Sequence, residues 1–448
     1  MKDQHNHFLS RRLGLFPITN IVIANMIGAG IFTTTGLLMA DLKDPMLMLI
    51  LWFVGGVIAF TGAMCYGEIG ASIPKAGGEY AILSRLYNPR LGFLSGWVSF
   101  VVGFSAPIAA SSIGSSEYLY RAMPYIFEFS WIEVAGMKKV YSILIILIFT
   151  LIHLRGVDFG TKVQNYLTLM KVMLVVGLIL FGFFLGNGDF SHLKPVEKIS
   201  MGELDWKTIG LSLMWIMFAF SGWNASVYIG SEIINPRRNI PMSLLIGTGV
   251  VALLYLLLNL LFIYAIPPKE MEGVIAIGGL ATGKLFGQNF EPIFSLFIAF
   301  ALFSSISAFI ILGPRVYFAM SADGHFFKFA SRIHQKYQVP TYSIIFQGVI
   351  SVVIILSGSF DQILTYMGFS LGIFPIITVF GIFKLRKQNK SVLKLPGYPI
   401  TPIIYILAGV TMLFLSFLER PMESSIAIIT ILAGLPAYYL FGRKKQKA

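Results

Sequence analysis

Cysteine is almost absent from this chain, which has one cysteine, Cys65, among 448 residues. A single cysteine excludes an intrachain disulfide and a cysteine-based metal site. Because Cys65 falls inside a long apolar run, we interpret it as a small buried side chain. Histidines are also few, and all six fall in expected tails, loops or helix ends. No carboxylate pair or cysteine–histidine set shares one depth, so the sequence predicts neither an enzyme nor a metal or other cofactor.

Charged residues are scarce as well: they make up 12% of the chain, whereas hydrophobic residues make up 56%. Apolar runs of roughly twenty residues recur from end to end, which excludes a soluble globular protein. Reading each run as a helix predicts an all-α polytopic membrane protein with twelve transmembrane helices. The predicted spans are 13–40, 45–69, 91–120, 139–154, 162–186, 208–231, 241–266, 290–320, 341–357, 360–383, 401–418 and 423–442.

No connection between the spans is long enough for a soluble domain. We therefore expect a tail at 1–12, a single transmembrane domain at 13–442 and a second tail at 443–448. The first apolar segment is too long for a cleavable signal peptide and lacks a small-residue cleavage site. Most of the 34 Lys and Arg residues fall in the tails and in alternate loops, and the other loops are richer in acids. By the positive-inside rule, both tails are cytoplasmic in a multi-pass cell-membrane protein. The net charge of +13 is then a topology signal, and no nucleic acid partner is expected.

Two predicted spans are interrupted by glycine near the middle of the membrane. Gly28 and Gly30 break the first span, and Gly222 breaks the sixth. Unwound chain is tolerated at that depth only where it is buried in protein or lines a polar cavity. Glycines in membrane helices also serve as close-packing positions, which is the alternative for either break alone. Spans one and six run in opposite directions, however, and matched breaks in two inverted halves indicate the central site of a transporter.

The breaks also predict what would bind there. Each break leaves free carbonyls at one helix end and free amides at the next, with partial negative and positive charge. Amides near Gly28 to Gly30 suit a carboxylate, and carbonyls at Phe218 to Phe220 suit an ammonium group. Glycine also lets a ligand approach the backbone closely. An α-amino acid is therefore the natural small-molecule substrate.

Lys171 lies ten residues into the fifth predicted span. A lysine within a membrane helix usually faces the bundle interior and has a partner or a function. The alternative is that its long side chain reaches toward the cytoplasmic helix end marked by Lys162.

Several motifs occur in an order that resembles the amino acid, polyamine and organocation transporter family, nearest its L-type amino acid transporter branch. The resemblance covers about residues 13 to 402. Its motifs are Ile27–Phe32 (IGAGIF), Gly67–Tyr80 (GEIGASIPKAGGEY), Phe218–Asn224 (FAFSGWN), Glu232–Pro241 (EIINPRRNIP), Arg315–Gly324 (RVYFAMSADG) and Leu395–Pro399 (LPGYP).

The resemblance implies a five-plus-five inverted repeat, working by alternating access, with helices one and six broken. Repeat one covers about 13–186, repeat two about 208–383, and helices eleven and twelve about 401–442. It implies that Phe218 closes over the substrate as a gate; the alternative is a lipid-facing or core phenylalanine. The substrate-binding residues carried over are Gly28, Ala29, Gly30, Ile31, Phe218, Ala219, Phe220 and Gly222.

The same resemblance assigns Lys171 to the place where sodium-coupled relatives bind an ion, so that its ammonium replaces the cation. Its expected partners are carbonyls around Gly28 and a hydroxyl among three serines of the eighth span, with Tyr255 near the same point. Serine and tyrosine in membrane helices often only pack or bond to their own backbone, which is the alternative. The three serines are Ser304, Ser305 and Ser307.

Three departures from the family pattern matter. Ala29 stands where many relatives have serine, which leaves only backbone donors for the carboxylate. The loop from Arg121 to Lys139 has no cysteine, so no disulfide-linked partner subunit is expected. Pro314 replaces the usual small polar residue before Arg315, which leaves the geometry of that helix end open.

The predicted function is secondary or facilitative transport of neutral L-amino acids, as sodium-independent exchange. No acid falls securely in mid-membrane, because Glu68 and Glu232 lie at cytoplasmic helix ends. A cationic amino acid or polyamine would thus lack a counter-charge, unless a shifted third helix brought Glu117 to the site. Proton-coupled symport is the nearest alternative, because burial can lower the pKa of a lysine such as Lys171. A further alternative is an amino acid sensor that binds its ligand without transporting it.

Overall fold

The computed structural model describes residues 11, 13–128, 133–194, 205–334, 336–337, 339–357 and 360–442. The expected tails at 1–12 and 443–448 lie outside the described residues, except for Arg11. Within the described ranges the chain is helical, and its strand-like pairing is limited to two isolated bridges, Leu13 with Ile233 and Ala76 with Ile229.

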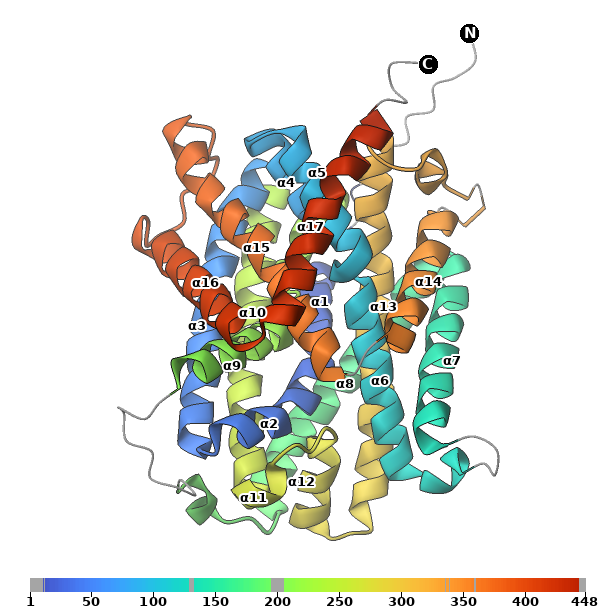
Figure 1. The fold of residues 1–448 in the computed structure, drawn as a ribbon, viewed down its shortest axis with the longest axis vertical. Helices are drawn as coiled ribbons and strands as arrows, with labels where there is room; N and C mark the ends of the chain where they lie inside the picture. Colours follow the sequence, from blue (N-terminus) through green and yellow to red (C-terminus); the bar gives the residue numbers. More distant parts are fainter. Residues whose placement is uncertain are drawn as a thin grey trace.

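Among the residues that the structure describes, ten helical segments are long and apolar enough to cross a membrane. Figure 1 shows most of them running along the long axis of the molecule. In the order of the chain they are α1 (Leu15–Met26) with α2 (Ala29–Leu42), α3 (Pro45–Ser72), α5 (Pro89–Val98) with α6 (Ser105–Ala122), α7 (Val134–Leu154), α8 (Val157–Leu185), α10 (Pro236–Ala265), α13 (Phe290–Ala322), α15 (Phe360–Lys387), α16 (Ile400–Glu419) and α17 (Pro421–Gly442).

Two further apolar helices match predicted spans but are shorter: α9 (Trp206–Ala219) and α14 (Thr341–Ser357). The sixth predicted span, 208–231, is α-helical only as far as Ala219. Beyond the break the chain continues as 3-10 turns at Ala225–Tyr228 and Gly230–Glu232. The break in the sixth span therefore ends the α-helix rather than only kinking it.

The connections contain helices that hydropathy does not reveal. Helix α4 (Gly78–Leu86) lies at the upper end of the molecule in Figure 1. Helices α11 (Pro268–Met271) and α12 (Ile277–Phe286) lie at the lower end. The third span also contains an irregularity, a π-helical turn at Ser99–Gly103 between α5 and α6.

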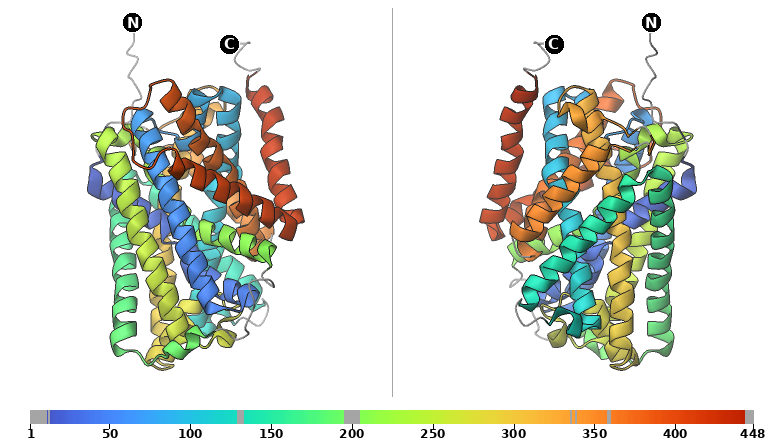
Figure 2. Two further views of the ribbon diagram at one scale, coloured as in Figure 1. Left: turned by 90° about the vertical axis from the view of Figure 1, so that its left-hand side faces the viewer. Right: turned by 90° about the vertical axis from the view of Figure 1, so that its right-hand side faces the viewer.

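The interior of the bundle is built by α1, α2, α6, α9, α10 and α13. Helix α10 packs along α3 and α1, and α13 packs along α6 and α8. Helices α16 and α17 lie at the side of the bundle (Figure 2). Their outward faces keep large apolar side chains exposed, such as Leu407 and Ile429 at 62% and 65%. Exposed apolar faces of this extent suit contact with lipid.

Two pairs of opposite charges lie at the α4 end of the bundle. Arg386 contacts the fully buried carboxylate of Glu68 through two hydrogen bonds of 2.7 and 2.5 Å. Arg315 contacts Glu232 at 3.1 Å. The backbone of Leu13 forms two hydrogen bonds with the segment after the second break: it donates to Glu232 (3.0 Å) and accepts from Ile234 (2.9 Å). The start of the first span is thus fixed to the end of the sixth.

Candidate functional site

The first break separates α1 from α2. Helix α1 ends at Met26 and α2 begins at Ala29, with Gly28 in extended conformation between them. The first amides of a helix have no partner within it, so the amides of Ala29, Gly30 and Ile31 are free of intrahelical bonds. They point with the positive end of the helix dipole toward the break. This geometry can bind an anionic group.

The second break follows α9. Gly222 has a φ of +100°, a conformation that side chains with a Cβ rarely adopt. A Cβ on Gly222 would also come within 2.6 Å of the Cβ of Asn25, at the end of α1. Both the backbone conformation and the lack of space therefore require glycine here. The break in the sixth span packs directly against the break in the first.

Lys171, which is fully buried in α8, binds the end of α1. Its Nζ donates to the carbonyl oxygens of Ala24 (3.0 Å) and Ile27, and to the hydroxyl of Ser305 on α13 (3.0 Å). Ser305 in turn donates to Ile27 at 2.9 Å. The ammonium thus links α1, α8 and α13 at the negative end of the α1 dipole. The side chain points into the bundle, not toward the helix end near Lys162.

The other two candidate serines lie elsewhere. Ser304 contacts Thr168 (3.2 Å) and Gln164 (3.4 Å), both on α8. Ser307 bonds to the ring of His153 on α7 at 2.9 Å. Of the three serines, only Ser305 contacts Lys171.

Tyr255 links the two breaks. Its hydroxyl lies within hydrogen-bond distance of the carbonyl oxygens of Met26, at the end of α1, and Ala219, at the end of α9 (2.9 Å to the latter). Together with Lys171 and Ser305 it supplies polar contacts to carbonyls that a helix end leaves without intrahelical partners. The site is therefore held by side chains from α8, α10 and α13.

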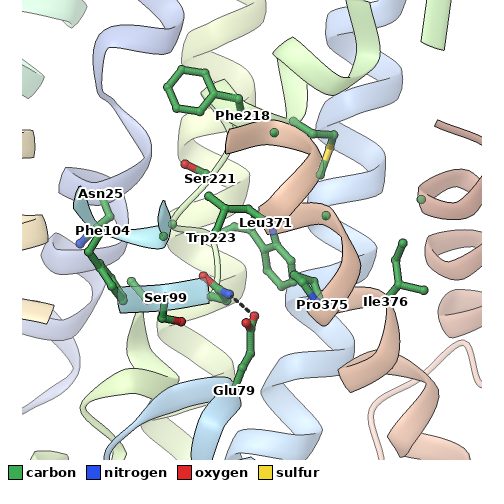
Figure 3. Close-up of a pocket in the computed structure, with 18 of the residues that line it drawn as sticks. Asn25, Glu79, Ser99, Phe104, Phe218, Ser221, Trp223, Leu371, Pro375 and Ile376 are labelled. Atoms are coloured by element: carbon green, nitrogen blue, oxygen red, sulfur yellow. Dashed lines mark hydrogen bonds between the residues drawn. The ribbon is translucent and has the colours of Figure 1, made fainter. Parts of the chain in front are cut away.

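Two neighbouring cavities lie at the breaks. The smaller, of about 10 Å³, is lined by Gly28, Ala29 and Gly30 on one side and by Phe218 and Ala219 on the other. The larger, of about 100 Å³, extends from Phe218 toward α4. Figure 3 shows Phe218 and Glu79 at opposite ends of this larger cavity.

The predicted binding residues divide between these cavities and the core. Phe218 lines both cavities, as expected for a side chain between them, and Gly222 lines the larger one. Ile31 and Phe220 line neither and are fully buried. The ring of Phe220 packs against Tyr255 and Trp52, with centroid distances of 5.0 and 6.0 Å. Any role of Ile31 or Phe220 toward a ligand must therefore come from the backbone.

Several cavity residues were missed by the sequence analysis. Asn25 lines both cavities, and its buried Oδ1 has no partner among the described residues. Ser99 and Gly103 of the π-helical turn line the larger cavity, and π-helical turns often occur at functional sites. A polar asparagine or serine within a long apolar run is a possible sign of a cavity-lining residue. Which of these polar residues face the cavity depends on the rotation of each helix about its axis, and the sequence does not give that rotation.

Glu79 is the most important cavity residue that the sequence analysis did not predict. It begins α4, in a connection that the sequence analysis treated as a cytoplasmic loop, yet it is 6% exposed and lines the larger cavity. Its Oε1 accepts hydrogen bonds from Tyr66 (2.6 Å) and Asn224 (2.9 Å). Burial raises the pKa of Glu79 to about 7, although these two hydrogen bonds lower it. Glu117, the acid considered from sequence, pairs with Lys138 at 2.7 Å and lines neither cavity.

The described residues include no group of three His, Cys, Asp or Glu side chains that could hold a metal ion. Cys65 is buried and unpaired in the structure. The chemistry that the site offers is therefore that of helix ends, one lysine, one glutamic acid and neutral polar side chains.

Comparison with known proteins gives one family and many relatives. A family described as amino acid permease matches residues 13–435. The chain is 28% identical over 449 residues to the serine/threonine exchanger SteT of Bacillus subtilis (strain 168), which covers 98% of both chains. It is 27% identical over 448 residues to Asc-type amino acid transporter 1 of Mus musculus, covering 98% of this chain and 83% of the relative. It is 28% identical over 445 residues to the b(0,+)-type amino acid transporter 1 of Mus musculus, covering 97% of this chain and 88% of the relative.

Proposed function

Because the chain belongs to the amino acid permease family, we propose that it carries neutral L-amino acids across the cell membrane by sodium-independent exchange. The similar proteins are transporters rather than enzymes, and the ten long apolar helices agree with a multi-span membrane protein. We further propose twelve spans in two inverted five-helix repeats plus two helices, with both termini cytoplasmic.

The observation that carries this proposal is the meeting of the two helix breaks. The free amides at the start of α2 face the small cavity, where they would bind the substrate carboxylate. The ammonium would bind at carbonyls of the α9 end and at the unpartnered Oδ1 of Asn25. An α-amino acid carries both charges on one carbon, so it satisfies both helix ends at once.

Lys171 supports sodium independence. Its ammonium already contacts the carbonyls of Ala24 and Ile27 and the Ser305 hydroxyl, the oxygen ligands that would otherwise suit a cation. A fixed positive charge at this point repels a second one and leaves no open coordination position. Transport would therefore need no sodium ion to hold α1 against α13.

The larger cavity suits the substrate side chain. Phe218 lies at its boundary with the small cavity and would close over bound substrate. The volume of about 100 Å³ is below the roughly 300 Å³ at which pockets for drug-sized ligands begin. This size favours a small substrate, which agrees with the name of the exchanger from Bacillus subtilis.

The test is uptake of labelled serine, alanine, leucine and tyrosine into proteoliposomes. Uptake is measured with and without internal amino acid, and with sodium or choline outside. We expect uptake that requires internal amino acid, is the same in both salts, and is faster for serine and alanine than for tyrosine. Uptake that falls to background in choline would contradict sodium independence. Saturable binding without movement of label would point to a sensor instead.

A further inference from the structure

Glu79 is a buried acid that no cation among the described residues balances. None of the ion pairs formed by the described residues includes it. The titratable groups that face it are Tyr66 of α3, Tyr228 after the second break and Tyr405 of α16. All three are neutral phenols near pH 7. An ionised carboxylate in these surroundings bears a desolvation cost that no fixed positive charge offsets.

The hydrogen bonds of Glu79 fit the protonated form. Both described donors, Tyr66 and Asn224, bond to the same oxygen, Oε1. A neutral carboxylic acid has one carbonyl oxygen with two lone pairs, and its other oxygen carries the proton. No described residue donates to Oε2, which leaves that oxygen free to hold a proton beside the cavity that Glu79 lines.

Glu79 also joins α4 to the unwound chain after α9. Asn224, its partner, belongs to the break in the sixth span. The backbone adds two contacts between the same segments: Gly77 donates to the carbonyl of Tyr228 (3.1 Å), and Ala76 forms a bridge with Ile229. A Cβ on Gly78 would come within 2.2 Å of the Tyr228 ring, so the two segments are closely packed. Together these contacts hold α4 against the unwound segment at the α4 end of the cavity.

We propose that Glu79 is a proton-binding site of the transporter, and that its protonation stabilises the closed contact between α4 and the unwound segment after α9. When the proton leaves for water, the carboxylate requires hydration, and hydration is available only if this end of the cavity opens. The proton is exchanged with bulk water, so no other reactant is needed. The inference rests on the proposed function, because it assigns to an amino acid carrier a proton that controls access from the α4 side.

Amino acid exchange at different pH values tests this inference. Exchange of labelled serine is measured in proteoliposomes from about pH 5 to about pH 9, a range that brackets the pKa near 7. Exchange should fall below this pKa, approaching about tenfold per pH unit, because the ionised fraction falls by that factor. Glu79→Gln, which resembles the protonated acid, should be slow and should not respond to pH. Glu117→Gln, which removes an acid outside the cavity, should keep the profile of the unmodified protein.

A second variant keeps the test decisive if Glu79→Gln does not fold. Tyr66→Phe removes a donor to Oε1, and this hydrogen bond lowers the pKa of Glu79. Its loss should shift the midpoint of the pH profile upward. A flat profile in the unmodified protein, or an unchanged midpoint in Tyr66→Phe, would overturn the inference. Uptake of lysine that depends on Glu79 and not on pH would also overturn it, since the acid would then serve as a counter-charge.

Infrared spectroscopy separates this inference from the proposed function. The protonated carboxyl group of Glu79 should give a C=O stretching band near neutral pH that disappears in Glu79→Gln and at alkaline pH. The measurement needs no substrate. If serine, alanine, leucine and tyrosine all fail to exchange while this band is present, the proposed function is wrong and the proton site stands. If exchange occurs and the band is absent, the proton site is wrong.

Discussion

A Cβ atom on Gly30 would lie 2.5 Å from the Cα of Ala219. This contact joins the first turn of α2 to the last turn of α9, the two helix ends that flank the smaller cavity. The nearest atoms of Ala219 are its backbone Cα and N and its Cβ, and none of these atoms can move aside without shifting the helix. The separation of the two breaks is therefore set by the absence of a side chain at residue 30.

Gly30→Ala should reduce amino acid exchange by about tenfold or more, because α2 must move away from α9 and displaces the carboxylate-binding amides. A displacement of about one ångström at a positioned site can have an effect of this size. Gly14→Ala is the control, since a Cβ there has nothing within 4 Å. Unchanged exchange by Gly30→Ala in proteoliposomes would show that the two breaks need not touch.

Lys171→Ala should abolish exchange and lower the melting temperature. The carbonyls of Ala24 and Ile27 would lose a charged donor, and an unsatisfied buried polar group costs about 1–3 kcal/mol. Lys162→Ala, on the same helix but exposed, should leave both quantities unchanged. Both are measured on purified protein, by exchange assay and by thermal unfolding. Normal exchange in Lys171→Ala would mean that the ammonium is only a packing element.

Phe218→Ala and Phe220→Ala should differ, although only one residue separates the two positions. Phe218 lines both cavities, so its loss should raise the KM for exchange and slow the maximal rate, with a smaller fall in melting temperature than in Phe220→Ala. Phe220 is fully buried against Trp52 and Tyr255, so its loss should cost about 3–5 kcal/mol of stability. Equal effects on KM and on melting temperature in the two variants would refute a gate at Phe218.

The contribution of Glu79 to the thermal stability of the protein should fall as pH rises from about 5 to about 8. The pKa of Glu79 is raised from 4.5 to about 7 in the folded protein, so the folded state binds more protons than the unfolded state between these values. Stability from this group is greatest below pH 4.5 and declines until the pH passes about 7. The shift corresponds to roughly 3 kcal/mol at most.

Melting temperatures of the unmodified protein and of Glu79→Gln, measured across this pH range, isolate the contribution of Glu79. The melting temperature of the unmodified protein relative to Glu79→Gln should be highest at low pH and should decline as the pH rises past about 7. Glu117→Gln, measured in the same way, is the reference for an acid outside the cavity. A difference that does not vary with pH would mean that Glu79 ionises as readily in the folded protein as in the unfolded chain.

The family, the helical class and the positions of the two breaks were predictable from sequence, because they depend on local properties. Hydropathy alone marks apolar helices, and the matched glycines in spans one and six indicate where those two helices are interrupted. Gly28 and Gly222 do lie at breaks in the structure. The family assignment from the motifs is confirmed by the match over residues 13–435. The roles given to individual site residues remain predictions.

Choices among neighbouring side chains could not be made from sequence. Ser304, Ser305 and Ser307 occupy different directions around one helix, and only the packing of α13 against α8 and α1 decides that Ser305 contacts Lys171. In the same way, the turn that ends α9 directs Phe218 to the cavities and Phe220 into the core against Trp52 and Tyr255.

Glu79 was missed for a different reason. Its helix α4 is short and not apolar, so hydropathy places it outside the membrane and says nothing of what covers it. Its burial depends on Gly77 and Gly78, which both adopt positive φ angles and let the segment turn back against Tyr228. Local sequence indicates that turn, but the partner against which it packs lies in the other half of the chain.

The two backbone hydrogen bonds between Leu13 and the segment around Glu232 have a mechanical consequence. They join the first broken span to the sixth at one end, and the contact of Gly30 with Ala219 joins them again at the breaks. Because the two spans are attached at two points, a movement of α1 should also move the 3-10 turns at Ala225–Tyr228 and Gly230–Glu232. A spectroscopic probe at Arg11 would therefore report the movement of residues more than two hundred positions later in the sequence.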